Sequence, residues 1–286
     1  MPDDDLLRPS LEATLRTWAS RVSANRDQVA RYREAVERTD HYAPIAADFR
    51  ADPRRHDDPL LEGLAPLINP SDVWLDIGAG GGRLTLPIAL AAREVIALDP
   101  SDGMLAVLRE GMAEHGIDNI RIVQGRWPTA NPPRADVVLI SHVGYDIEEI
   151  GPFLDGMEVA ARRQCVAVLF WRRPTWAADA LWPEVHGEPR APLPALPEFI
   201  TVQSSRGRMC EIRTVELPPM SYDSFDRVLT FARIQTWVAP GGAKDRRVQA
   251  LLRDRLTERA GRLAFDWNPV PVGIVTWHPD AQIPCG

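Results

Sequence analysis

The sequence predicts an α/β fold in which helices cover both faces of a parallel sheet. Short apolar runs alternate with amphipathic segments between residues 73 and 171, a pattern typical of buried parallel strands linked by helices. The first run, Val73–Asp76, leads into the glycine-rich turn Gly78–Arg83, and the second, Glu94–Leu98, ends at Asp99. A glycine-rich turn followed by an acid at the tip of the next strand is typical of a nucleoside site.

Hydrophobic periodicity predicts the elements in order along the chain. Strands are expected at Val73–Asp76, Glu94–Asp99, Ile120–Gln124, Asp136–Ser141, Gln164–Trp171, Cys210–Leu217 and Pro271–Trp277. Helices are expected at Leu84–Arg93, Gly103–His115, Glu148–Arg162, Tyr222–Trp237 and Lys244–Arg259. Six prolines between residues 174 and 197 predict an irregular connection with one helix at most.

The N-terminal region predicts a long helix from about Leu11 to Glu37, with an apolar stripe that includes Leu15 and Trp18. This helix is expected to pack on the main domain, to cover a ligand cleft, or to do both. We expect a helical cap at residues 1–65 and a catalytic domain at residues 66–286. A helical insertion is expected at about residues 221–262.

Composition narrows the class of protein. Apolar residues make up 45% of the 286 residues, enough for a sizeable core, and no apolar run is long enough for a membrane span. The N-terminus has no signal-peptide pattern, and three widely spaced cysteines form no disulfide or metal framework, so a cytoplasmic protein is expected. The 33 basic and 40 acidic residues give a formal net charge of −7, which disfavours a nucleic-acid partner.

The turn sequence distinguishes between nucleoside cofactors. A dinucleotide fingerprint needs a small residue where Arg83 stands, and the P-loop pattern is absent. The stretch Val73–Arg83 resembles motif I of the class I S-adenosylmethionine (SAM)-dependent methyltransferases. The stretch Ala97–Leu105, with Asp99, Pro100 and Met104, resembles motif II of that family.

The resemblance implies a seven-stranded Rossmann-like sheet, mostly parallel, with an antiparallel last strand. It implies that Asp76 reads the methionine end of SAM, that Asp99 takes the ribose hydroxyls and that Met104 packs on the adenine. Helix capping is the alternative role for Asp99. The cofactor-binding residues expected from the resemblance are Asp76, Gly78, Ala79, Gly80, Gly82, Asp99, Pro100, Met104, Gly125, Arg126, Trp127, Ser141 and His142.

The stretch Gly125-Arg126-Trp127 departs from the family pattern of Gly-Asp-Ala. An arginine cannot accept the hydrogen bond that the aspartate takes from the adenine amino group. Stacking of Trp127 on the adenine and recognition by the main chain are the two alternatives.

Two polar residues after the fourth strand are candidates for catalysis. His142 is either a general base or part of the cofactor pocket wall, and Tyr145 is a second candidate. Alignment of the acceptor atom with the methyl group is an alternative to base catalysis. For the acceptor pocket we expect Tyr42, Trp182 and His186, and the histidines show no metal-ligand spacing.

These observations predict an enzyme that transfers the methyl group of SAM to a small organic acceptor, leaving S-adenosylhomocysteine and using no metal. Neither a membrane nor nucleic acid is an expected partner, and the protein is expected to be a monomer or a homodimer. The alternatives are a methyltransferase acting on RNA or protein, an NAD-dependent oxidoreductase (disfavoured by Arg83), and a non-catalytic SAM-binding protein.

Overall fold

Ten strands make up the two sheets of the computed structural model, which describes residues 9–34, 40, 42–172, 177–265 and 269–279. They are β1 (Val73–Ile77), β2 (Glu94–Asp99), β3 (Ile120–Gln124), β4 (Ala135–Ser141), β5 (Ala161–Phe170), β6 (Glu211–Leu217), β7 (Ser221–Tyr222), β8 (Leu256–Arg259), β9 (Arg262–Phe265) and β10 (Val270–Trp277).

Nine α-helices and two 3-10 helices are found in the described part of the chain. The α-helices are α1 (Leu11–Tyr32), α2 (Pro59–Leu64), α3 (Thr85–Ala89), α4 (Asp102–His115), α5 (Ile150–Ala160), α6 (Ala177–His186), α7 (Leu196–Ser205), α8 (Phe225–Thr236) and α9 (Ala243–Arg255). The 3-10 helices are η2 (Ala43–Phe49) and η3 (Ala65–Leu67).

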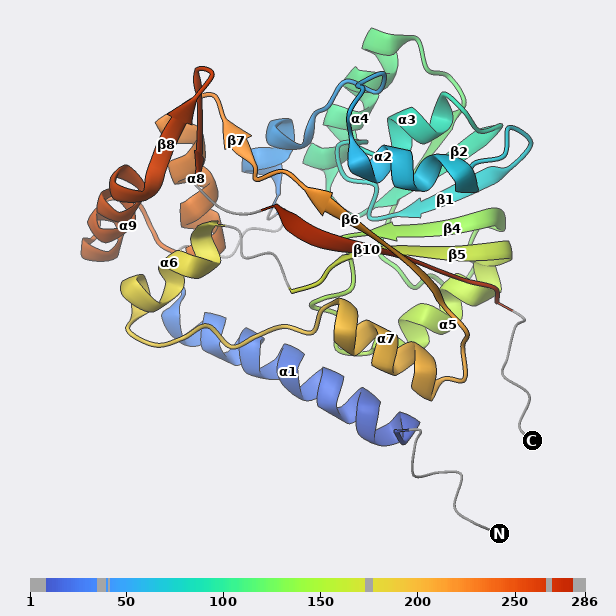
Figure 1. The fold of residues 1–286 in the computed structure, drawn as a ribbon, viewed down its shortest axis with the longest axis horizontal. Coiled ribbons are helices and arrows are strands. Elements are labelled where there is room, and N and C mark those ends of the chain that lie inside the picture. The colour runs from blue at the N-terminus through green and yellow to red at the C-terminus, as the bar shows by residue number, and fades with distance from the viewer. Residues whose placement is uncertain (1–8, 35–39, 41, 173–176, 266–268, 280–286) are drawn as a thin grey trace.

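The larger sheet has the strand order β3-β2-β1-β4-β5-β10-β6. The first five strands of this order are parallel, and β10 pairs antiparallel with both β5 and β6. Helices α2, α3 and α4 cover one face, and α1, α5 and α7 cover the other (Figure 1). This arrangement confirms the predicted fold class, including the antiparallel last strand.

The central strand β1 is buried along its whole length because helices cover both of its faces. Gly63 and Gly273 mark two close approaches of helix to strand. A Cβ atom at Gly63 would lie 2.4 Å from Ile274 Cδ1, and one at Gly273 would lie 2.4 Å from Leu196 Cδ2. These contacts bring α2 and α7 against the two faces of β10.

Helix α1 packs on the main domain through Trp18 and Val22, which belong to its core. The indole N–H of Trp18 donates to the carbonyl of Ile147 at 2.8 Å. Of the two roles left open for this helix, packing is therefore the one that the structure shows. The helix ends at Tyr32, earlier than the predicted end near Glu37, because the backbone is already extended at Arg33.

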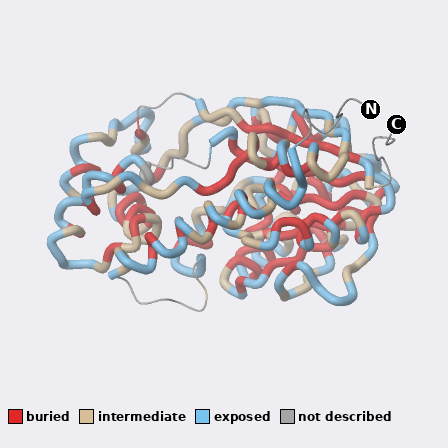
Figure 2. The backbone as a smooth tube through the Cα atoms, turned by 90° about the horizontal axis from the view of Figure 1, so that it is seen from below, coloured by how far each residue is buried: buried red, intermediate tan, exposed pale blue. Residues whose placement is uncertain are grey.

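A smaller lobe lies beside the sheet and has a hydrophobic core of its own (Figures 1 and 2). It contains α6, α8 and α9 and a three-stranded sheet in the order β7-β9-β8. The carboxylate of Asp245 in α9 accepts two hydrogen bonds from the Arg233 guanidinium in α8, at 2.7 and 2.9 Å. This pair ties the two helices together.

Three features of the last third of the chain differ from the sequence prediction or are missing from it. The helix expected at Lys244–Arg259 ends at Arg255, and Leu256–Arg259 forms β8 because it pairs with β9. The three-stranded sheet was missed, since its strands have only two to four residues. The proline-rich connection holds one helix, α6, as expected, but α7, which begins at Leu196, was not predicted.

Candidate functional site

The glycine-rich turn between β1 and α3 lies against the loop that follows β4. The Gly78 amide donates to the Leu98 carbonyl at 2.7 Å, which ties the turn to the end of β2. Gly78 has φ of +76°, and a Cβ atom there would lie 2.4 Å from Cγ2 of Val143. Only glycine therefore fits this position. Gly80 and Gly82, the other predicted glycines of the turn, also have positive φ.

Asp76 of β1 is 2% exposed and has one carboxylate oxygen without a partner among the described residues. Its Oδ2 accepts a 2.6 Å hydrogen bond from the Thr85 hydroxyl, while Oδ1 accepts none. Burial raises the pKa of Asp76 to about 6; the Thr85 bond opposes this shift, and the negative charge of Asp99 adds to it. Since a buried unsatisfied acceptor costs about 1–3 kcal/mol, Oδ1 is suited to a donor on a ligand.

Asp99 lies at the tip of β2, the strand that pairs with β1. Its carboxylate accepts hydrogen bonds from the amides of Gly80 and Ser101, both at 2.8 Å. Burial raises the pKa of Asp99, with the charge of Asp40 adding to the shift. Each carboxylate oxygen keeps a further lone pair, so the group can still accept hydroxyl donors. The capping role belongs to Ser101, whose hydroxyl accepts from the Met104 amide.

The segment that contains η2 lies against the glycine-rich turn and the start of α4. The Asp40 carboxylate accepts from the Ser101 hydroxyl at 2.8 Å and from the Gly103 amide at 3.1 Å. Phe49 packs on a small apolar cluster that includes Met104, which is 5% exposed. We call residue 40 together with η2 the clasp, because its contacts join the N-terminal region to the start of α4.

A cavity of about 350 Å³ lies at the carboxyl ends of the strands, next to the clasp. Its apolar wall includes Phe49, Phe170, Leu217, Met220, Tyr222 and Phe265. Its polar wall includes Asp48, Arg55, Asp57, Asp58, Arg83 and His142. The volume is within the range of small-molecule sites, about 300–1,000 Å³.

His142 connects the cavity to the end of β4. Its ring stacks on Phe170 with centroids 4.1 Å apart and 19° between the planes. Its φ of +57° is a strained conformation for a non-glycine residue, and such residues concentrate at functional sites. Burial lowers the pKa of His142 to about 3, with the charge of Arg83 adding to the shift. The imidazole is therefore neutral near pH 7, and a pKa this low makes it a weak base.

Tyr145 lies behind His142 and does not line the cavity. It is 7% exposed, and its hydroxyl oxygen accepts a hydrogen bond from the Phe170 amide at 2.8 Å. The same oxygen is 3.4 Å from His142 Nδ1. Tyr145 therefore holds the stacked pair in place, and its position does not support the predicted role as a catalytic group.

The structure does not place Trp127 for the predicted stacking on adenine. Its indole packs against Gly156 of α5, and its N–H donates to the Phe153 carbonyl at 3.1 Å. The preceding Arg126 is exposed. Gly125 remains close to the cofactor side, because its amide donates to the Asp99 carbonyl at 3.1 Å. Trp127 therefore packs on α5 and not on the expected adenine site.

The remaining predicted cofactor residues lie at the same edge of the sheet. Ala79 belongs to the glycine-rich turn and is 7% exposed. Pro100 follows Asp99 directly and is exposed, whereas Ser141 is the last residue of β4 and is half-buried. Their contacts with a cofactor stay predictions.

The predicted acceptor residues do not meet at the cavity. Trp182 is fully buried and His186 is 9% exposed; their rings contact each other in the small lobe, with centroids 4.2 Å apart. His186 Nε2 is 2.9 Å from the Thr236 carbonyl oxygen. Tyr42 is 45% exposed and lies edge-on against Phe49. The expected acceptor wall is corrected accordingly: α6 buries Trp182 and His186 against Tyr32 of α1.

Most residues of the cavity wall were not predicted from the sequence. Arg83 was noticed only because it excludes a dinucleotide site, and Phe170, Met220 and Phe265 were not singled out. These side chains come from segments far apart in the chain. Only tertiary packing brings them together, so no local pattern marks them.

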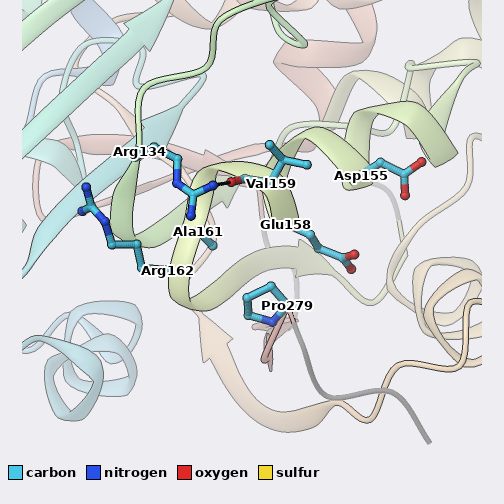
Figure 3. Close-up of a pocket in the computed structure, with 7 residues that line it drawn as sticks. All are labelled: Arg134, Asp155, Glu158, Val159, Ala161, Arg162 and Pro279. Carbon is cyan, nitrogen blue, oxygen red and sulfur yellow. Dashed lines mark hydrogen bonds between the residues drawn. The ribbon is translucent and has the colours of Figure 1, made fainter.

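A second hollow lies at the amino ends of β4 and β5, on the opposite edge of the sheet (Figure 3). There the guanidinium of Arg134 donates to the Val159 carbonyl at 2.6 Å, and Glu158 is one of the acidic side chains in the lining. It includes none of the residues expected to bind cofactor or acceptor.

Two negative findings apply to the residues that the structure describes. No group of three or more His, Cys, Asp or Glu side chains is arranged to hold a metal ion. None of the described helices combines the length and apolar character that crossing a membrane requires.

Comparison with known proteins places the site in a family. Residues 75–158, from β1 into α5, match the family described as "Methyltransferase domain". The ribosomal RNA small subunit methyltransferase G of Neisseria gonorrhoeae is 39% identical over 83 residues, 28% of this chain and 40% of that protein. A protein of Methanocaldococcus jannaschii named "Probable cobalt-precorrin-6B C(15)-methyltransferase (decarboxylating)" is 37% identical over 59 residues, 21% of this chain and 32% of that protein. The chain thus spans less than half the length of these relatives.

The crystal structure of the YcgJ protein from Bacillus subtilis shares the fold. It aligns with a TM-score of 0.52 and 15% identity, covering 77% of this chain and 99% of that one. The family predicted from the sequence is confirmed by these matches. Residues 75–158 thus form a methyltransferase domain, and the seven-stranded sheet that contains them has the arrangement predicted from the resemblance to the class I SAM-dependent methyltransferases.

Proposed function

We propose that this protein transfers the methyl group of SAM to a small organic acceptor held in the cavity beside His142. The unpartnered Oδ1 of Asp76 is the observation that carries this proposal. It is a buried acceptor on β1, next to the strand that carries Asp99 and at the edge of the sheet where the cavity lies. SAM has an ammonium group and two ribose hydroxyls, which are the donors that two such carboxylates require.

The described residues fit this cofactor in three respects. Asp76 would hold the ammonium group, Asp99 the ribose hydroxyls and Met104 the adenine, while the turn at Gly78 and Gly80 lets the backbone come close. SAM, when bound, supplies a methyl group on a positively charged sulfur. The residues of this chain orient the acceptor and exclude water, and the neutral imidazole of His142 can accept a hydrogen bond from an acceptor hydroxyl.

Two observations favour a small acceptor over a nucleic acid. The cavity wall is largely aromatic and aliphatic, and the net charge of −7 gives little general attraction for phosphates. The similarity to a ribosomal RNA methyltransferase favours RNA as the second candidate, but it extends over only 28% of this chain.

Calorimetric titration with SAM and, separately, with NAD tests the cofactor. We expect SAM to bind and NAD not to bind; the reverse result would refute the proposed function. Transfer of labelled methyl from SAM to a panel of small organic molecules and to bulk cellular RNA tests the acceptor. Label in RNA alone would favour the second candidate. Tight SAM binding without transfer to any acceptor would favour a non-catalytic role.

A further inference from the structure

Arg83 lines the cavity together with His142 and has hydrogen-bonding capacity to spare. Its side chain is 52% exposed, and its guanidinium makes one hydrogen bond, from Nη2 to Asp58 Oδ2 at 3.3 Å. No other acceptor contacts this guanidinium among the residues that the structure describes. An arginine has five N–H donors in a planar fork, so most of them remain available to a ligand.

The carboxylate of Asp58, which contacts Arg83, also accepts hydrogen bonds from other groups. Asp58 Oδ1 accepts from the amides of Leu60 and Leu61 at the start of α2, at 3.0 and 3.3 Å. Its Oδ2 accepts from Arg55 Nε at 2.7 Å. Although burial opposes it, the hydrogen bond and charge of Arg55, with the charge of Arg83, lower the pKa of Asp58. The carboxylate is therefore ionised at neutral pH and shared by two arginines.

In this part of the cavity wall, two guanidinium groups therefore share one carboxylate. Arg55 also donates to the carbonyls of Asp52 and Arg83, at 3.1 and 3.0 Å, so Arg83 is the less engaged of the two guanidinium groups. Of the other acids in the lining, Asp48 forms an ion pair with Arg227. Asp57 is exposed to solvent, where water weakens its field. The charge of Arg83 reaches His142, since it contributes to the low pKa of that imidazole.

The rest of the cavity lining is largely apolar and favours an apolar ligand. Phe49, Phe170, Met220, Tyr222 and Phe265 surround a space of about 350 Å³. Aromatic walls of this kind favour flat rings, and a small number of polar groups then fixes the orientation of the ligand. Here the available polar groups are the Arg83 fork and the His142 ring.

We propose that the acceptor is a small, ring-containing organic acid whose carboxylate pairs with Arg83 while its ring lies among the aromatic side chains. This inference rests on the proposed function, and it names the class of acceptor. The planar guanidinium matches a carboxylate in a two-point pair, which a neutral amide cannot form. Arg83 is in this view a specificity-determining residue.

Binding of two matched probes tests the inference. The probes are 2-naphthoate and 2-naphthamide, titrated by calorimetry into protein saturated with S-adenosylhomocysteine. We expect the acid to bind at least about tenfold more tightly than the amide, the effect of one charged hydrogen-bonded pair. We expect Arg83→Gln to abolish this preference and Arg83→Lys to keep part of it. Arg54→Gln, which changes an exposed arginine of a neighbouring loop outside the lining, should keep all of it.

Equal affinity for the two probes, no binding of either at millimolar concentration, or a preference that survives Arg83→Gln would overturn the inference. Tight binding of a single-stranded RNA fragment that is lost in Arg83→Gln would also overturn it, by assigning Arg83 to a phosphate. The titration with S-adenosylhomocysteine distinguishes failure of the proposed function from failure of this inference. Failure of that step counts against the proposed function, and the probes can then be compared in the cofactor-free protein.

Discussion

The carboxylate of Asp76 accepts a 2.6 Å hydrogen bond from Thr85 through one oxygen, and its other oxygen has no partner in the described part of the chain. Strand β1 and helix α3 meet through this bond across the glycine-rich turn. The arrangement holds the free oxygen in a fixed, buried position. Replacement of Asp76 should therefore change both the stability of the protein and its binding of the cofactor.

Asp76→Asn should stabilise the ligand-free protein at pH 7.5 and weaken its binding of SAM. The native pKa of about 6 lies above the ordinary value of 3.8, so the native state holds this proton longer than the unfolded state does. The contribution of Asp76 to stability is therefore fully present below pH 3.8 and is lost as the pH rises to about 6. Denaturant titrations at pH 4.5 and 7.5 should show the variant gaining about 1–3 kcal/mol over wild type at the higher pH. Equal differences at the two pH values would contradict the shift.

Asp99→Ala should weaken SAM binding by more than about 1 kcal/mol, the scale of a lost charged hydrogen bond. The change also removes the acceptor for the Gly80 and Ser101 amides. Asp99→Asn is therefore the control, since its amide oxygen still accepts one of these bonds. Calorimetry on folded variants measures the affinity. Unchanged affinity in Asp99→Ala would remove the ribose assignment.

His142→Phe should make the protein less sensitive to acid. The native pKa of about 3 lies below the ordinary 6.5, so between these values the unfolded state binds the proton and the native state does not. Stability from this residue is present above pH 6.5 and is lost as the pH falls toward 3. Phenylalanine keeps the stack on Phe170 without titrating. On going from pH 7.5 to 5.5, wild type should lose up to about 1 kcal/mol more than the variant.

His142→Gln separates the two roles left open for this residue. As a general base, His142 contributes about 10²–10⁴-fold to the rate, so kcat should fall by that factor with little change in KM. As a wall residue, it should affect mainly KM. Single-turnover rates with an identified acceptor give the distinction. Tyr145→Phe is the comparison variant, because it keeps the ring but removes the hydroxyl that contacts both His142 Nδ1 and the Phe170 amide.

Asp40→Ala should speed the exchange of SAM. Asp40 fastens the clasp to Ser101 and Gly103 at the start of α4, where Phe49 contacts the Met104 cluster. Loss of these bonds should raise the dissociation rate of SAM about fivefold or more, the effect of about 1 kcal/mol. Stopped-flow measurements with Asp48→Asn as a control show whether the effect belongs to Asp40. An unchanged dissociation rate would mean that the clasp does not restrain the cofactor.

The sheet could be predicted well because its signals are local. Apolar runs such as Val73–Ile77 and Glu94–Asp99 are buried on both faces, and this burial fixes both their composition and their length. The small sheet could not be predicted. The β8 stretch Leu256–Arg259 continues a helical pattern in the sequence, and only its pairing with β9 makes it a strand. Short strands are determined by their partners rather than by their own residues.

The sequence by itself determined the family and the candidate cofactor residues, because Asp76, the glycine-rich turn and Asp99 lie close together in the chain and their spacing carries the chemistry. Tertiary structure alone decided the acceptor side. It buried Trp182 and His186 against each other and against Tyr32 of α1, and it packed Trp127 on α5. It brought Arg83, His142 and Phe170 to one cavity. The physical reason is that a cavity wall is made by the packing of distant segments, and apolar side chains pack wherever the fold offers them burial.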